Sequence, residues 1–358
     1  MYQKSTHRHS IFCILPPHIL RAIAQNGRPQ QRVRALQTMA TDNTFRSLRA
    51  SLRPQAPTTR RRPGVLAVEA QKHRTICDAH STQTLPGDVV RTEGASPTGD
   101  AAVDEAYDGL GATFDFYLEV YERNSIDDEG LPLDATVHFG QAYNNAFWNG
   151  ERMVFGDGDG EIFNRFTISL DVIGHELTHG VTEDEAQLVY YFQPGALNES
   201  VSDVFGSLVK QYKLKQTADQ ADWLIGAGLF TANVKGVALR SMKAPGTAYD
   251  DPVLGKDPQP ANMSNYVRTY EDNGGVHINS GIPNHAFYLA ATQIGGFAWE
   301  GAGRIWYETL RDPQLRRSAG FKRFAQLTIA QAGKLFGAES PEQKAVLNGW
   351  NQVGIDAS

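Results

Sequence analysis

The segment His175-Glu176-Leu177-Thr178-His179 places two histidines four residues apart, with a glutamate directly after the first. Positions i and i+4 of an α-helix lie on one face, so a helical segment brings both imidazoles to one metal ion. Glu176 then lies near the ion without ligating it. This layout is typical of zinc hydrolases, in which the glutamate handles the proton of a metal-bound water. The alternative is an exposed amphipathic helix that carries two histidines by chance.

The sequence pattern changes from strands to helices at this segment. Before it, apolar and polar residues alternate between Gly, Asp and Asn turns, which predicts strands interrupted by one helix over Ala101 to Glu122. After it, helical spacing dominates, and Ser340 begins the last helix with a capping box. The sequence therefore predicts an α+β fold, with a β-rich domain over residues 63–169, an α-helical domain over 170–358 and the histidine segment at their junction. The expected strands include Asp88–Thr92, Ala135–Phe139 and Arg152–Phe155.

A catalytic zinc ion needs three protein ligands and one open position. The candidate third ligand is Glu199, which follows His179 after enough residues for a loop and the start of an antiparallel helix. Asp203 lies four residues further on the same helical face, where it can accept the other ring N–H of His175. Ser169 is the expected N-cap of the metal helix. A solvated acidic helix face is the alternative for Glu199 and Asp203.

A second candidate cluster is Asp272-Asn273-Gly274-Gly275-Val276-His277. The glycines permit a tight loop, in which Asp272 holds one ring nitrogen of His277. Hydrolysis through a tetrahedral intermediate needs a donor for the developing oxyanion, and such a histidine would serve. The alternative is an ordinary loop histidine.

The composition is that of an ordinary globular protein. The chain has 358 residues, 41% hydrophobic and 21% charged, enough for about two domains. No apolar run approaches the roughly 18–20 residues of a membrane span. The run Ile11–Leu15 ends at Pro16-Pro17, and it is shorter than the about 7–15 apolar residues of a secretory signal, so no signal peptide is recognisable. Cys13 and Cys77 make no disulfide framework, and we expect free thiols.

Residues 1–63 form a basic arm with twelve Lys and Arg side chains and one acid, Asp42. Its charge of +11, within a total of −6, leaves −17 on the rest of the chain. Two short helices are expected, over His18 to Ala24 and Gln30 to Met39, before an exposed linker over Pro54 to Gly64. Such an arm can bind nucleic acid, direct the chain to an organelle or dock on its own acidic body, and composition leaves these alternatives open.

Together these segments resemble the thermolysin family of zinc endopeptidases. The resemblance covers roughly residues 85–358 in the family's order and spacing. Besides the two histidine clusters, it rests on Tyr143 to Gly150, Gly156 to Gly160, Asn198 to Asp203 and Leu239 to Met242. It implies a two-domain α+β fold and an endopeptidase with one zinc ion, which cleaves internal peptide bonds on the amino side of hydrophobic residues.

The resemblance also implies roles for individual residues. The implied zinc ligands are His175, His179 and Glu199. Glu176 is the implied general base, which later passes the proton to the leaving amine. Tyr190 and His277 are implied to bind the oxyanion, and Asp203 and Asp272 to orient His175 and His277. For substrate, the implied residues are Asn145 and Ala146 on an edge strand, Arg240 for the carbonyl beyond the scissile bond, and Phe163, Val172 and Leu239 around a hydrophobic pocket.

The start of the chain resembles the short pro-segment of the protealysin subgroup, in which Pro-Pro precedes a helix. This implies a zymogen whose residues 1–62 cover the cleft as an intramolecular inhibitor and are removed autocatalytically near Arg53 to Gly64. We therefore favour docking on the body over nucleic-acid or membrane binding, and expect a monomer that acts on peptides and proteins. A Cys13 thiolate on zinc is an alternative way to close the site. The family favours secretion, here without a classical signal, and a cytoplasmic enzyme is the alternative.

One departure from the family concerns calcium. The paired-calcium site of the family uses several acids, and Asp171 and Asp222 match it. However, Lys210, Leu224 and Ala227 stand where carboxylates are expected. The Lys210 ammonium brings positive charge to the place of a cation, so we expect it to replace the ions and expect no double-calcium site.

Two other functions remain open from the sequence. An aminopeptidase of a related zinc class would need an acidic anchor for the free amine of its substrate, and the sequence carries no motif for one. A catalytically silent peptide-binding module is the second. The intact Glu176 and His277 argue against it.

Overall fold

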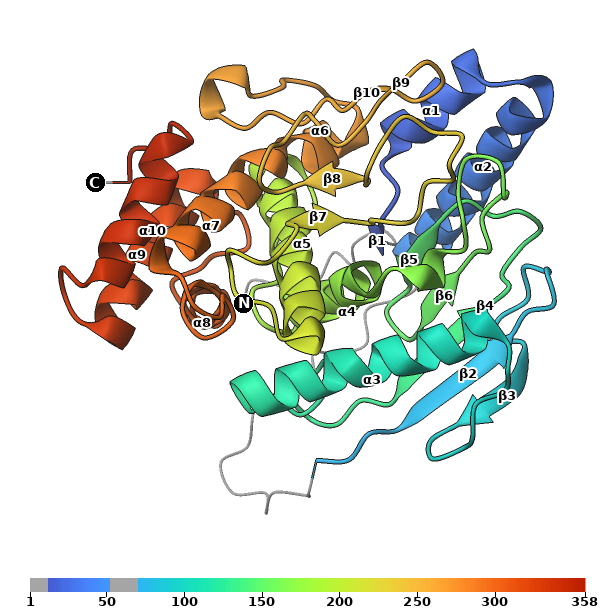
Figure 1. The fold of residues 1–358 in the computed structure, drawn as a ribbon, viewed down its shortest axis with the longest axis horizontal. Helices are drawn as coiled ribbons and strands as arrows, with labels where there is room; N and C mark the ends of the chain where they lie inside the picture. The colour runs from blue at the N-terminus through green and yellow to red at the C-terminus, as the bar shows by residue number, and fades with distance from the viewer. Residues whose placement is uncertain (1–11, 52–69, 358) are drawn as a thin grey trace.

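The computed structural model describes residues 12–51 and 70–357 (Figure 1). Within them, a six-stranded sheet has the order β1-β5-β6-β4-β2-β3. Strand β4 is parallel to β2 and β6, and the other neighbours are antiparallel. The start of the chain thus adds one strand, β1, to the β5 edge. The strands are β1 (Phe12–Cys13), β2 (Arg74–Asp78), β3 (Asp88–Thr92), β4 (Leu133–Val137), β5 (Ala146–Trp148) and β6 (Met153–Phe155).

Helix α3 (Ala101–Tyr121) packs on the sheet and also contacts the helical part of the molecule. Asp100 begins it by accepting hydrogen bonds from the backbone N–H groups of Ala102 and Val103, as an N-cap does. Glu122, in the left-handed region, ends it. The helix expected over Ala101 to Glu122 is therefore confirmed.

The second half of the chain is mainly helical and gathers around α5 (Phe192–Leu214) (Figure 1). Helix α4 (Leu170–Asp184), which carries His175 and His179, packs closely on α5 because a glycine of α5, Gly206, faces it. A Cβ at Gly206 would lie 2.3 Å from the carbonyl oxygen of Asp171. The remaining elements are η1 (Phe166–Ile168), β7 (Leu224–Ile225) paired with β8 (Arg240–Ser241), β9 (Asp250–Asp251) paired with β10 (Gly255–Lys256), η2 (Met263–Asn265), α6 (Asp272–Asn279), α7 (Gly281–Ile294), α8 (Ala302–Leu310), α9 (Phe321–Phe336) and α10 (Pro341–Gln352).

These elements confirm the predicted α+β fold, with the β-rich part first. Ser169 occupies the N-cap position of α4 as expected, but its side chain makes no cap hydrogen bond and donates instead to the carbonyl oxygen of Ala227. None of the described helices is long and apolar enough to cross a membrane.

The N-terminal helices α1 (Pro17–Asn26) and α2 (Pro29–Ser51) lie at the end of the molecule where β1 pairs with β5 (Figure 1). The prediction that the second of them ends near Met39 is wrong. Contacts with the body extend it, since Asp42 accepts a hydrogen bond from Asn145 and the Phe45 ring lies 5.2 Å from that of Phe147. Tertiary contacts thus override the weak helix propensity of residues 41–44. The expected linker over Pro54 to Gly64 lies outside the described residues.

Candidate active site

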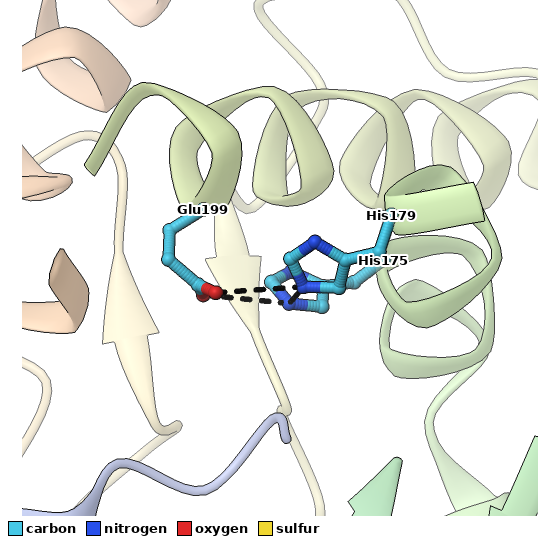
Figure 2. A group of neighbouring side chains, drawn as sticks. All are labelled: His175, His179 and Glu199. Carbon is cyan, nitrogen blue, oxygen red and sulfur yellow. Dashed lines mark hydrogen bonds and ion pairs between the residues drawn. The ribbon is translucent and has the colours of Figure 1, made fainter. Parts of the chain in front are cut away.

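The two histidines of α4 turn their rings toward one point (Figure 2). The Nδ1 atom of His175 donates to Asp203 Oδ1 at 2.8 Å, and that of His179 donates to Asn198 Oδ1 at 2.8 Å. Because these oxygens only accept, each Nδ1 carries the ring proton and each Nε2 presents a lone pair. The two Nε2 atoms lie 3.1 Å apart. Two lone pairs at this distance are placed to bind one cation together.

Glu199 on α5 completes this group from the opposite side (Figure 2). Its two carboxylate oxygens lie 3.5 Å from His179 Nε2 and 3.6 Å from His175 Nε2, and Glu199 Oε2 accepts no hydrogen bond. Burial, with His175 adding to it, lowers the pKa of His179 well below its usual range, which keeps the neutral form that ligates metal. The two imidazoles and the carboxylate fit a zinc ion and form a potential metal site.

Glu176 is fully buried beside these ligands. One oxygen, Oε2, accepts the backbone N–H of Trp148 at 3.0 Å, while Oε1 is buried without a hydrogen bond. Burial, with the charge of Glu199 adding to it, raises the pKa of Glu176 well above its usual range. A carboxylate in this state binds a proton readily, as a general base must.

His277 faces the same point from α6. Inside this element, Asn273, Gly274 and Gly275 have positive φ, and the resulting turn brings Asp272 Oδ1 to 2.6 Å from His277 Nδ1. Burial alone would lower the pKa of His277, but the Asp272 carboxylate raises it to about 9. The protonated ring therefore donates from Nε2 to the carbonyl oxygen of Cys13 at 3.1 Å. Tyr190 lies 3.3 Å from the same Nε2, and its hydroxyl donates to Glu199.

Asp203 on α5 accepts hydrogen bonds from side chains on three other elements, α4, β8 and α7. Besides His175, it accepts Arg240 Nε and Nη2, each at 2.8 Å, and Asn284 Nδ2 at 2.8 Å. Arg240 and His175 hold the pKa of Asp203 below its usual range, although burial alone would raise it. Arg240 thus serves Asp203 as well as the carbonyl oxygen of Ile14, to which its Nη1 donates at 3.1 Å.

The sequence did not single out Asn198, Ser202 or Asn284. Asn198 and Ser202 lie beside Glu199 on α5, and both contact His179 Nδ1, so their helical neighbourhood was a usable signal. Asn284 lies on α7, and no local pattern relates it to Asp203 on α5.

Two expected substrate-binding residues, Asn145 directly before β5 and Ala146 at its first position, bind residues 14 and 15. Ala146 accepts the N–H of Ile14 at 3.2 Å, and Asn145 Oδ1 accepts the N–H of Leu15 at 3.1 Å. The expected pocket residues are Phe163, Val172 and Leu239. They are fully buried, as are Ile14 and Leu15.

The basic arm docks on the acidic body as far as it is described. Arg21 pairs with Glu271, while Arg28 and Arg34 pair with Glu161. The one acid of the arm, Asp42, is buried and accepts hydrogen bonds from Tyr143 and Asn145.

Cys13 does not belong to the ligand group found among the described residues. Its side chain packs in a small cluster with Phe139 and Phe147, and its sulfur lies 3.8 Å from Arg46 Nη2. Burial, with Asp42 adding to it, raises the pKa of the Cys13 thiol, which disfavours the thiolate that a zinc ligand requires. Both cysteines are free and buried.

Lys210 lies among the residues that resemble a calcium site. Its ammonium lies 2.7 Å from Asp171 Oδ2, 2.9 Å from Asp222 Oδ1 and 2.8 Å from the carbonyl oxygen of Leu224. Burial alone would lower the pKa of Lys210, but the two carboxylates raise it. The ammonium therefore stays charged between them.

Comparison with known proteins agrees with this geometry. Two family models match, the thermolysin metallopeptidase catalytic domain over residues 52–183 and its alpha-helical domain over residues 186–355. The chain is 56% identical to an extracellular metalloprotease of Pectobacterium carotovorum subsp. carotovorum, over 97% of each chain. It is 50% identical to protease PrtS of Photorhabdus sp., over 96% of this chain and 91% of the relative.

A solved structure agrees as well. The precursor of protealysin, a metalloproteinase from Serratia proteamaculans, is 54% identical, with a TM-score of 0.87, over 96% of this chain and 99% of its own. That structure is a precursor, as expected for a chain with a docked N-terminal segment. The chain belongs to the thermolysin family of zinc metalloendopeptidases.

Proposed function

We propose that this chain is made as a latent endopeptidase in which Glu176 is the general base and His277 and Tyr190 bind the oxyanion. The observation that carries this proposal is the backbone of residues 13–15, which is bound by the same residues that would bind a substrate. A cleft that holds one peptide this way can hold another by the same β-strand addition.

Zinc bound by His175, His179 and Glu199 would supply a polarised water and draw charge from the substrate carbonyl. The chain's own residues do the rest. Asp203 and Asn198 fix the orientation of the two imidazoles.

Proton transfer falls to Glu176. The Trp148 N–H holds Oε2 and leaves Oε1 without a hydrogen bond, so this oxygen can take the proton of the attacking water and deliver it to the leaving nitrogen. The raised pKa of Glu176 favours the first of these transfers and the buried setting keeps bulk water away.

His277 and Tyr190 stabilise charge on the substrate oxygen. Asp272 keeps His277 protonated, with a pKa of about 9, so its Nε2–H is a charged donor near neutral pH. A donor that is already in place stabilises the developing negative charge without having to reorganise during the reaction. Arg240 binds the next carbonyl, and the pocket of Phe163, Val172 and Leu239 favours a hydrophobic residue after the scissile bond.

We further propose that residues 1–62 inhibit the enzyme until they are removed near Arg53 to Gly64, that the enzyme acts as a monomer, and that it is secreted. The extracellular metalloprotease among its relatives supports secretion. The buried docking of α1 and α2 supports inhibition, because their strand β1 occupies the edge of β5 that a substrate needs.

The test uses a peptide blocked at both ends, offered to the processed enzyme with a zinc chelator and with zinc restored. We expect cleavage on the amino side of hydrophobic residues, loss of activity with the chelator and recovery with zinc. An aminopeptidase would leave the blocked peptide intact and cut only the free-amine form. A silent binding module would bind both and cut neither.

Latency depends on Asp42, whose carboxylate accepts from Tyr143 and from Asn145 Nδ2 at 3.0 Å. Asp42→Ala leaves two buried donors without an acceptor, at a cost of about 1–3 kcal/mol each. We expect hydrogen exchange of the α1 and α2 amides to speed up by about tenfold or more in a full-length chain that carries Glu176→Gln and cannot process itself.

The matched control is Arg28→Gln, which breaks an exposed ion pair with Glu161. Such a pair contributes at most about 1 kcal/mol, so exchange in this variant should stay close to that of the parent. Equal exchange in the Asp42 and Arg28 variants would contradict a specific role for Asp42.

We also propose that the Lys210 ammonium takes the place of the paired calcium ions. Lys210→Ala leaves the buried Asp171 carboxylate with the Gly226 N–H as a remaining partner, and we expect a stability loss of about 1–3 kcal/mol. The midpoint of thermal unfolding of the parent should not rise when calcium is added. A calcium-dependent rise in the parent, or two calcium ions in its crystals, would contradict the proposal.

A further inference from the structure

The peptide bond between Cys13 and Ile14 lies at the point where the catalytic groups converge. The carbonyl oxygen of Cys13 accepts from His277 Nε2 at 3.1 Å, and the N–H of Ile14 donates to Ala146 at 3.2 Å. The oxygen of this peptide bond is thus hydrogen-bonded to His277, the proposed oxyanion donor, and its nitrogen is hydrogen-bonded to Ala146 on β5.

The next residues continue in the same register. Arg240 Nη1 donates to the carbonyl oxygen of Ile14 at 3.1 Å, and Asn145 Oδ1 accepts the N–H of Leu15 at 3.1 Å. Four consecutive backbone groups, from the Cys13 carbonyl to the Leu15 N–H, are therefore each bound by a residue assigned to the oxyanion or to substrate. An inhibitor that only filled the cleft would not need this register.

The base also lies in the correct place. Strand β1 pairs with β5 opposite Phe147 and Trp148, and the Trp148 N–H holds Glu176 from the same strand. Ala146, which begins β5, accepts the Ile14 N–H at 3.2 Å. One strand therefore binds both the Glu176 carboxylate and the nitrogen that would leave.

The side chains fit the expected preference. Ile14 would follow the cut, and its apolar side chain is fully buried. The proposed specificity is for cleavage on the amino side of a hydrophobic residue. Ile14 in this position satisfies it.

We infer that Cys13–Ile14 is an autolytic site, cut within its own molecule. This inference rests on the proposed function of the cleft. Water adds its oxygen to the Cys13 carbonyl carbon, the C–N bond to Ile14 breaks, and Glu176 carries the proton of the water to the Ile14 nitrogen. The products are a carboxylate at Cys13 and an amine at Ile14, so no other reactant is needed.

This cut alone does not open the cleft. Helices α1 and α2 remain docked after it, through Asp42 and the ion pairs of Arg21 and Arg28. Ile14 and Leu15 therefore stay in place until the linker is cut as well. Maturation then has two steps, of which the first is intramolecular.

The experiment follows full-length chain, purified without zinc, after zinc is added. Samples are quenched over time for intact mass and N-terminal sequencing. We expect a chain that begins at Ile14 and a fragment of residues 1–13, at a rate that is constant over about a hundredfold range of protein concentration, as for an intramolecular step. Glu176→Gln should show no cut.

Variants of Ile14 make the test specific. Ile14→Gly should slow the cut by about 10- to 200-fold, because the hydrophobic pocket loses its occupant, whereas Ile14→Leu should be cut at close to the parental rate. The matched control is Val33→Ala on the exposed face of α2, which should leave the rate unchanged.

Two results would overturn the inference while leaving the proposed function intact. One is a released pro-segment that still contains an intact Cys13–Ile14 bond, from an enzyme that cleaves the blocked peptide. The other is a rate at Cys13–Ile14 that rises in proportion to protein concentration. If neither the chain nor the blocked peptide is cut, both the inference and the proposed function are wrong.

Discussion

Glu176→Gln, with its linker cut by a second protease because the variant cannot process itself, is expected to lower kcat on a blocked peptide by about 10²–10⁴-fold, the usual contribution of a general acid–base group. The amide has nearly the shape of the carboxylate, and its oxygen can still accept the Trp148 N–H that holds Oε2 at 3.0 Å. It cannot take a proton from water. The variant should therefore keep its fold and its zinc while it loses the chemical step.

Three measurements separate this outcome from a structural defect. Zinc content and the midpoint of thermal unfolding should match those of the parent, while kcat falls. Glu129→Gln, an exposed glutamate, is the matched control and should keep full activity. Activity at the parental level in Glu176→Gln would remove Glu176 from the mechanism and leave proton transfer to another group.

The metal group could be anticipated because its spacing is local. Two histidines at i and i+4 share a helical face wherever that helix lies, and Glu199 with Asp203 repeats this spacing on the next helix. The structure adds what brings α4 and α5 together, a glycine at position 206 that lets the backbones approach. The α+β order of the elements followed from the change of apolar periodicity along the chain.

The arrangement around Asp203 could not be anticipated in the same way. Arg240 comes from β8 and Asn284 from α7, and both reach the carboxylate only after the chain has folded. No periodicity relates residues of three different elements. The family resemblance assigns Arg240 to substrate binding. No sequence pattern indicates that Arg240 also pairs with Asp203.

The length of α2 was misjudged for a related reason. Residues 41–44 have the composition of a turn, and the helix continues through them because Asp42 and Phe45 reach the body. The charge count identifies Asp42 as the one acid of the arm, but it does not indicate which residues Asp42 contacts. In the structure this carboxylate is buried and accepts hydrogen bonds from Tyr143 and Asn145. Asp42 therefore makes a specific contact, in addition to the attraction between the basic arm and the acidic body.

Asp203→Ala is expected to have the largest effect on stability and on zinc binding together. It leaves the buried Arg240 guanidinium without its partner, and breaking a buried pair in this way costs about 3–5 kcal/mol. It also frees His175 Nδ1 from the oxygen that orients the ring at 2.8 Å. Loss of such a partner lowers zinc affinity by about 10- to 100-fold.

Chemical denaturation and zinc competition with a chelator measure the two effects separately, and their controls differ. Asp203→Asn keeps the volume and one acceptor oxygen, so it should lose less stability than Asp203→Ala while still weakening zinc. Asp222→Asn removes a half-exposed carboxylate beside Lys210 and should leave zinc affinity unchanged. If Asp203→Ala bound zinc as tightly as the parent, Asp203 would hold only Arg240, and the orientation of His175 would depend on the packing of α4 against α5.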